Sequence, residues 1–101
     1  MIIEVATIRV KDGLEAEFEA AVGKAVDVFR RADGCLGLVL TRCVEDPSHY
    51  DVVIRWKTLE DHTVGFRGSP LFAEWRALVG PFFAEPPSVK HYANMFAPVT
   101  F

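Results

Sequence analysis

The order of hydrophobic and polar residues in the first third of the chain predicts a strand followed by a helix. Residues 2–11 are rich in β-forming side chains, and apolar residues then recur every three or four positions across residues 14–29. Asp12 is expected to cap this helix, with Glu15 three residues later completing a reciprocal capping arrangement. Asp33-Gly34 offers a residue that can adopt the left-handed conformation with which many helices end. A strand is expected to follow directly.

Two alternating segments in the middle of the chain predict a hairpin. Residues 35–45 and residues 50–57 each alternate between two faces, and Asp46-Pro47-Ser48-His49 between them is typical of a turn. His49 is therefore expected to lie exposed in the turn. In residues 35–45 both faces carry apolar side chains, which is unusual for a sheet with one face in water.

The last part of the chain predicts a second helical region and a fourth strand. Thr58 is expected to cap the first piece of the helical region, residues 58–79. Ser69-Pro70 restarts the helix, because Ser caps well and Pro is tolerated at the first helical position. Gly80-Pro81 ends it. Residues 88–96 then alternate between apolar and polar positions and predict a strand.

The order β-α-β-β-α-β predicts one α+β domain over residues 1–101 with the ferredoxin-like fold, a four-stranded antiparallel sheet with both helices on one face. The other face should be polar if it met water. A second copy of the chain packed on it would cover a larger apolar patch than soluble monomers usually expose. We therefore expect a homodimer whose interface includes Ile3, Val5, Val39, Cys43, Val53 and Phe96.

Composition and charge narrow the range of functions. The chain has 101 residues and a mass of 11.3 kDa, enough for one core, and its apolar runs are far too short to span a membrane. A net charge of −3 with scattered Lys and Arg argues against nucleic acid and anionic membranes as partners. Cys35 and Cys43 are expected to be free thiols. The N-terminal residues do not read as a secretion signal, so the expected location is the cytoplasm.

The most distinctive part of the sequence runs from residue 56 to residue 92. It contains Trp56-Lys57-Thr58-Leu59-Glu60-Asp61-His62, then Gly65-Phe66-Arg67-Gly68-Ser69-Pro70-Leu71-Phe72-Ala73-Glu74-Trp75, and then Pro81-Phe82-Phe83 ahead of Pro86-Pro87-Ser88-Val89-Lys90-His91-Tyr92. Together with the order of elements, this stretch resembles the antibiotic biosynthesis monooxygenase domain family. The resemblance implies a dimeric α+β barrel with a pocket in each subunit between sheet and helices.

The resemblance implies a choice of activities, because one fold hosts several chemistries. Some members oxygenate quinol-like or polycyclic aromatic substrates with molecular oxygen and neither metal nor flavin, some relatives cleave haem, and others isomerise small carbonyl compounds. Haem-cleaving members carry an Asn in the first strand and a His after the Ser-Pro cap, where this chain has Ala6 or Thr7 and Arg76. Polyketide-type oxygenases use an Asn four residues before the third-strand Trp, and this chain has Val52 there but keeps Trp56. Haem cleavage is therefore disfavoured.

Three residues are candidates for the catalytic set. Cofactor-free oxygenation needs a base, and the imidazoles of His62 and His91 can titrate near neutrality with little tuning. Many members place a His where this chain has Phe66, and His62 lies one helical turn earlier. An exposed helix position remains open for His62, and a structural role bonded to backbone for His91. Trp56 offers a flat wall and an N–H donor, with core packing as the alternative.

Other residues near the second helix are expected to bind the substrate: Phe66, Phe72, Trp75, Arg76 and Tyr92. The aromatic rings would form walls, and the guanidinium of Arg55, Arg67 or Arg76 could hold an anionic oxygen, with an exposed arginine of no specific role as the alternative. Most of the aromatic residues could equally belong to the core. No metal-ligand set or phosphate-binding glycine motif is apparent, so no metal and no cofactor are expected.

These features favour a cofactor-independent monooxygenase that oxidises a small aromatic or quinol-type molecule with molecular oxygen. Two alternatives remain open. One is a non-catalytic module that binds or senses a small hydrophobic ligand. The other is an isomerase or lyase of a small carbonyl compound, in which a His moves protons and no oxygen is consumed.

Overall fold

The structure is a computed structural model that describes all residues, 1–101. Its strands and main helices follow the predicted order, and two short helical segments, η1 and η2, flank the second helix. The elements are β1 Ile2–Arg9, α1 Glu15–Arg30, β2 Cys35–Arg42, β3 His49–Trp56, η1 Asp61–Phe66, α2 Pro70–Val79, η2 Gly80–Phe82 and β4 Ser88–Tyr92.

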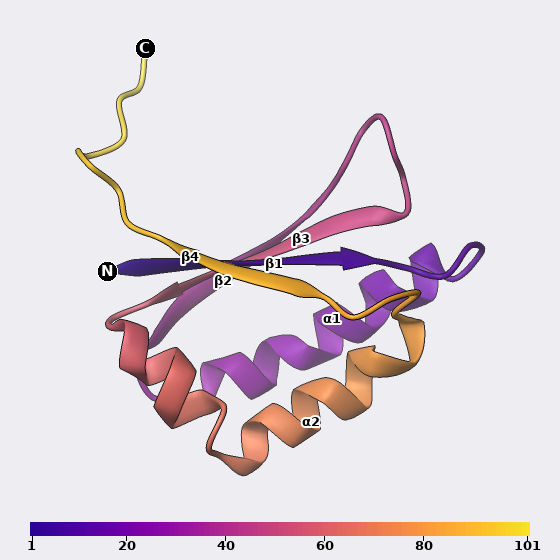
Figure 1. Ribbon diagram of the computed structural model, residues 1–101, viewed down its shortest axis with the longest axis horizontal. Coiled ribbons are helices and arrows are strands. Elements are labelled where there is room, and N and C mark those ends of the chain that lie inside the picture. The colour runs from indigo at the N-terminus through magenta and orange to yellow at the C-terminus, as the bar shows by residue number, and fades with distance from the viewer.

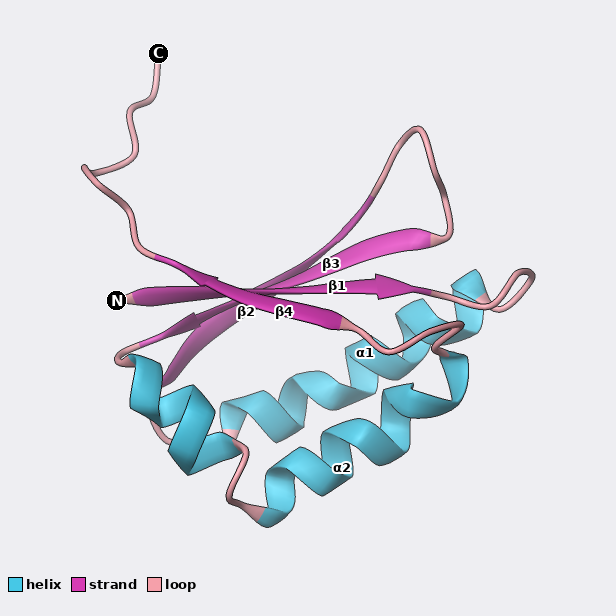
Figure 2. Cartoon of the chain, in the orientation of Figure 1, coloured by secondary structure: helices cyan, strands magenta, loops and turns pink.

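The four strands form one antiparallel sheet in the order β2-β3-β1-β4. Both helices cover the same face, and Figures 1 and 2 show α1 and α2 running side by side along it. The predicted ferredoxin-like α+β fold is confirmed. None of the helices is long and apolar enough to cross a membrane.

The core fills the space between this sheet face and the two helices. Alternate residues of β1 and β3 point toward the helices, because successive side chains of a strand face opposite sides of the sheet. Their buried side chains meet an aromatic cluster that joins α1, β3 and α2. Phe29 of α1 lies at its centre, with ring centroids 4.9 Å from Trp75, 5.1 Å from Phe66 and 6.5 Å from Trp56.

The start of α1 differs from the prediction. The helix begins at Glu15 and its cap residue is Leu14, so Asp12 is not the cap. Gly13 has a φ of 85°. The Glu15 carboxylate folds back and accepts a hydrogen bond of 3.0 Å from the backbone N–H of Gly13. Asp12 instead accepts a bond of 3.4 Å from the hydroxyl of Ser48. Of the predicted capping pair, only Glu15 bonds a backbone N–H at the helix start. The helix begins after Gly13, because the positive φ of Gly13 is not helical.

Several predicted strand boundaries were also wrong. β2 ends at Arg42, and β4 ends at Tyr92, after which residues 93–101 leave the sheet (Figure 1). A register shift between Cys35 and Gly37 turns Leu36 to solvent. His49 opens β3 instead of lying in the turn. Both thiols are free, as predicted.

The two caps predicted in the second helical region are confirmed. The hydroxyl of Thr58 accepts a hydrogen bond of 3.1 Å from the N–H of Asp61, and the hydroxyl of Ser69 accepts one of 3.2 Å from the N–H of Leu71. Between them η1 winds as a π-helix, with the N–H of Arg67 bonded to the carbonyl of His62 five residues earlier. This wide turn buries both His62 and Phe66, its two inward-facing rings.

The sheet face opposite the helices carries a row of valines across three strands. Val53 of β3 is paired with Val5 on one side and Val39 on the other. Val39 is 52% exposed, and further apolar side chains of the C-terminal residues, including Phe96 at 75%, are exposed. Cys43 and Phe96, expected on this face, lie outside the strands. The apolar character predicted for the face therefore rests on the strand residues.

Gly34 offers a test of how closely α1, β2 and η1 meet. It has a φ of 79°, and a Cβ added there would collide with the side chain of Asp61. We expect Gly34→Ala to lower the free energy of unfolding by about 1–3 kcal/mol in urea titrations, through strain and this collision. Gly23→Ala, in the middle of α1 with open space around it, should raise it by about 0.5–1 kcal/mol. Equal effects at the two positions would contradict the geometry.

Candidate functional site

A cavity of about 560 Å³ lies between the sheet and α2. β1 supplies one wall through Glu4, Ala6 and Ile8, and the segment before β4 closes one end. The opposite walls are mainly aromatic, formed by Phe29, Phe66, Phe72, Trp75 and Phe83. This size and lining suit a small, flat organic molecule.

A series of polar side chains in close contact lies at one end of the cavity. The strand register places Glu4 of β1 directly beside His91 of β4, on the face toward the helices. Trp56 donates its Nε1–H to Glu4 Oε1 over 2.9 Å, and His62 Nε2 lies 3.3 Å from the same oxygen. His62 Nδ1 is 2.8 Å from His91 Nε2. The series therefore runs from Glu4 through His62 to His91.

Burial sets the charge of the three side chains in this series. Glu4 is 5% exposed and His62 2% exposed. Burial lowers the pKa of His62 to about 4, helped by the charges of Arg67 and His91, so the imidazole is neutral at pH 7. Burial raises the pKa of Glu4, against the opposing effects of the Trp56 hydrogen bond and Arg67. Burial, followed by Arg67, also lowers the pKa of His91.

The two imidazoles share one proton, so their tautomers are linked. In one tautomer pair, His62 carries its proton on Nε2, next to the Glu4 carboxylate, and accepts at Nδ1 from His91 Nε2–H. In the other, His62 carries its proton on Nδ1 and donates it to His91 Nε2, so that Nε2 can accept from a protonated Glu4. A change of protonation at Glu4 thus favours the other tautomer pair and reaches His91, which is partly exposed.

Trp56 contacts Glu4 and His62 from the side of the core. Its side chain is fully buried, and its ring stacks on that of His62 with centroids 5.3 Å apart and planes 23° apart. The indole N–H is used by Glu4, and the residue is not among those that line the cavity. Trp56 therefore orients Glu4 and His62 and forms no wall.

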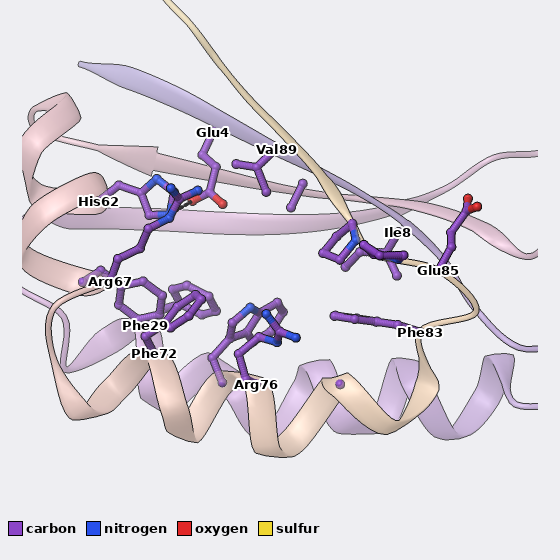
Figure 3. A pocket seen from close by; sticks show the side chains of 16 residues that line it. Glu4, Ile8, Phe29, His62, Arg67, Phe72, Arg76, Phe83, Glu85 and Val89 are labelled. Atoms are coloured by element: carbon purple, nitrogen blue, oxygen red, sulfur yellow. Dashed lines mark ion pairs between the residues drawn. The ribbon is translucent and has the colours of Figure 1, made fainter.

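Most of the predicted substrate-binding residues meet at the cavity. Phe66, Phe72, Trp75 and Arg76 all line it, and Figure 3 shows Arg76 between its two ends. Tyr92 does not line it, because it follows the inward-facing His91 and so points to the opposite face of the sheet.

One polar residue of the site was not predicted, Glu4. It lines the cavity, and it had a signal in the sequence: it shares the inward alternation of Ala6, Ile8 and Val10, so it is a carboxylate at a core position. Of the three arginines considered for an anionic oxygen, Arg67 and Arg76 line the cavity and Arg55 does not. Figure 3 shows Arg67 beside His62 and Glu4.

The donors at this end do not converge on a point. His62 uses one ring nitrogen toward Glu4 and the other toward His91, so the groups lie in series. No group of three or more His, Cys, Asp or Glu side chains in the chain is placed to hold a metal ion. The arrangement suits proton transfer along a line of hydrogen bonds.

Comparison with known proteins identifies the family. The family model described as antibiotic biosynthesis monooxygenase matches residues 1–78, well over half of the chain. The chain belongs to this family. A crystal structure from Bordetella bronchiseptica assigned to the same family is 48% identical, with a TM-score of 0.92 over 94% of this chain and 97% of that one.

The chain is also similar to two further proteins. The uncharacterised protein YczJ of Bacillus subtilis is 39% identical over 95 residues, covering 94% of this chain and all of that protein. SnoaB of Streptomyces nogalater, described as a cofactor-independent oxygenase and solved as a point mutant, has a TM-score of 0.79. It is 17% identical, with 95% of this chain and 94% of that chain covered, so this likeness concerns the fold.

The burial of His62 predicts a measurable pH dependence. Its pKa of about 4 in the folded protein lies below the ordinary 6.5, so between these values the unfolded chain binds more protons there. Stability from this residue is therefore lost as the pH falls through that window. When the pH falls from 7 to 5, the free energy of unfolding should decrease in both proteins. The decrease should be smaller for His62→Gln than for the unchanged protein, by about 1–2 kcal/mol.

Two measurements complete this test. Proton NMR should show the His62 ring titrating at about 4 in the folded protein. The same titration of His62→Gln should lack this signal, which assigns it to His62. A His62 ring that titrates between 6 and 7 would contradict the burial argument.

Proposed function

We propose that the protein is a cofactor-independent monooxygenase that oxidises a small aromatic or quinol-type substrate with molecular oxygen. The observation that carries the proposal is the Glu4–His62–His91 chain at one end of an aromatic-walled cavity. Such chemistry needs a group that takes a proton from a phenol or enol and a largely apolar enclosure around the resulting anion. Family membership supports the assignment to the monooxygenase class.

The proposed reaction begins with proton transfer from the substrate. Glu4 lines the cavity, and its Oε2 has no hydrogen-bond partner in the chain, so it is the acceptor. Its raised pKa makes it a better base than an exposed carboxylate. In the tautomer pair with the His62 proton on Nδ1, Glu4 passes its proton to His62 Nε2 as the Nδ1 proton moves to His91 Nε2, and His91, which is partly exposed, releases a proton from Nδ1 to water, which restores ionised Glu4. His62 and His91 thus act as the path by which the proton leaves.

The electron-rich anion then reacts with oxygen. One electron passes from the enolate to O₂, and the radical pair combines to form a C–O bond. Uptake of a proton gives a hydroperoxide, and loss of water leaves a carbonyl where the substrate had a CH₂ group. Substrate and O₂ become quinone and water, so atoms and electrons balance without a cofactor. Arg67, beside Glu4, stabilises the anion.

Oxygen uptake tests this proposal. With anthrone as substrate, we expect Glu4→Gln to slow oxygen consumption roughly 10²–10⁴-fold, the usual contribution of a general base. The replacement keeps an oxygen for the Trp56 N–H, so the fold should persist. His62→Gln and His91→Gln should show smaller losses, because each breaks the proton path beyond the acceptor. His49→Gln should retain full activity.

The alternative of a non-catalytic binding module has one observation in its favour. Both ring nitrogens of His62 are engaged within the chain, and its pKa is lowered to about 4, which makes it a weak base at neutral pH. Ligand binding with no oxygen consumption above that of Glu4→Gln would support this alternative and defeat the monooxygenase proposal. Turnover of a carbonyl compound without oxygen would instead support the isomerase alternative.

We also propose that the protein is a homodimer through the sheet face opposite the helices. The Val39–Val53–Val5 row gives this face a continuous apolar strip. The C-terminal segment extends away from the sheet on the side opposite the helices (Figure 1), and its apolar side chains Met95, Phe96, Val99 and Phe101 are exposed. The cavity lies on the helix side, so dimerisation leaves it open.

Sedimentation measures the proposed dimer directly. At micromolar concentration we expect a mass about twice 11.3 kDa. Val53→Lys should shift the protein toward monomer, because it buries a charge in the interface. Val64→Lys, at an exposed position on η1, is the matched control and should remain dimeric. A monomeric unchanged protein would contradict the proposal.

A further inference from the structure

The charged groups that line the cavity are unevenly partnered. They are two carboxylates, Glu4 and Glu85, and two guanidiniums, Arg67 and Arg76. Glu4 is bonded to Trp56 and lies beside His62, and Glu85 lies 3.9 Å from Arg9. Both carboxylates thus have partners within the chain.

The two guanidiniums have no such partners. Neither Arg67 nor Arg76 forms an ion pair or side-chain hydrogen bond with another residue, whereas Arg9, Arg31 and Arg42 do. Arg31, for example, lies 2.9 Å from Glu74, and Arg42 lies 3.1 Å from Glu19. The cavity therefore presents unneutralised positive charge to whatever fills it.

Aromatic rings position Arg76. Its guanidinium carbon lies 6.0 Å from the ring centre of Phe72 and 5.8 Å from that of Phe83. Such contacts with ring faces stabilise a guanidinium and leave its N–H donors free. Figure 3 shows Arg76 on α2 between the Arg67 end and the Phe83 end of the cavity. A ligand lying between the rings would meet these donors.

Arg67 acts at the other end. Its charge lowers the pKa of Glu4, His62 and His91, so its field reaches the whole proton path. The anion formed there by proton loss would already be balanced by Arg67. Arg76 is then left for a second negative group of the ligand.

We infer that the cavity binds an aromatic carboxylate, with its ring system between the aromatic walls and its carboxylate on Arg76. A carboxylate fits because its two oxygens match the paired N–H donors of one guanidinium. This inference rests on the proposed function for the choice of cavity, and it names the substrate class. The reacting hydroxyl or enol would lie at the Glu4 end.

Binding without oxygen tests the inference separately from catalysis. Titration calorimetry under argon would compare 2-naphthoate with its neutral counterpart 2-naphthamide at pH 7.5. We expect the carboxylate to bind at least about tenfold more tightly. Arg76→Gln should abolish this preference while leaving the affinity for the amide unchanged. Arg30→Gln, an exposed and unpaired arginine of α1 outside the cavity, should keep the preference.

The outcomes separate the two proposals. A carboxylate preference that depends on Arg76, without oxygen uptake for any phenolic substrate, supports the ligand class and defeats the monooxygenase. Oxygen uptake with equal affinity for naphthoate and naphthamide supports the monooxygenase and overturns the ligand class. Failure of both compounds to bind, or a preference that survives Arg76→Gln, also overturns it.

Discussion

The site depends on one constraint, the burial of a carboxylate at the centre of a sheet. Glu4 lies on the central strand β1 with a neighbour on each side, where an unpartnered carboxylate would cost several kcal/mol. Trp56 and His62 meet that cost with a hydrogen bond and a close polar contact. No buried side-chain nitrogen or oxygen of the chain lacks a partner. Buried polar networks satisfied in this way hold their members in fixed positions.

The same aromatic residues serve the core and the site. Trp56 contacts Phe29 at the centre of the core and stacks on His62 at the edge of the cavity. Phe66 lies in the core cluster and also lines the cavity. The hydrophobic packing that holds α1 and α2 on the sheet therefore also fixes the orientation of the polar groups. This overlap explains why a small domain can support a preorganised site.

The fold was predictable because its signals are local. Alternation in the strands, the period of the helices and the Ser69-Pro70 cap all lie within short windows of sequence. The site was less predictable, because it combines three strands and a helix. His62 is buried only because η1 winds as a π-helix, and no local pattern predicts that winding. The cavity wall formed by Arg76 was predicted, since helical spacing places it near Phe72 and Trp75.

Two errors about the site came from the alternation of strands. Tyr92 and His91 are adjacent in β4, so they cannot both lie on the helix side of the sheet, and the inward position of Val89 favours His91, which contacts His62 without lining the cavity itself. Glu4 was not predicted although it alternates with buried residues, because a carboxylate at a core position is an exception to the rule that charged side chains are exposed. Such an exception is often the functional residue.

The alternation in β1 has a consequence for how the chain tolerates change. Glu4 faces the cavity, while its neighbours Ile3 and Val5 face the apolar side of the sheet. Shifting the pairing of β1 by one residue would leave the strand intact but exchange the two sets of side chains. The carboxylate would then lie among the valines, and an isoleucine or valine would face His62. The register of one strand thus fixes both the polar end of the cavity and the apolar face of the sheet.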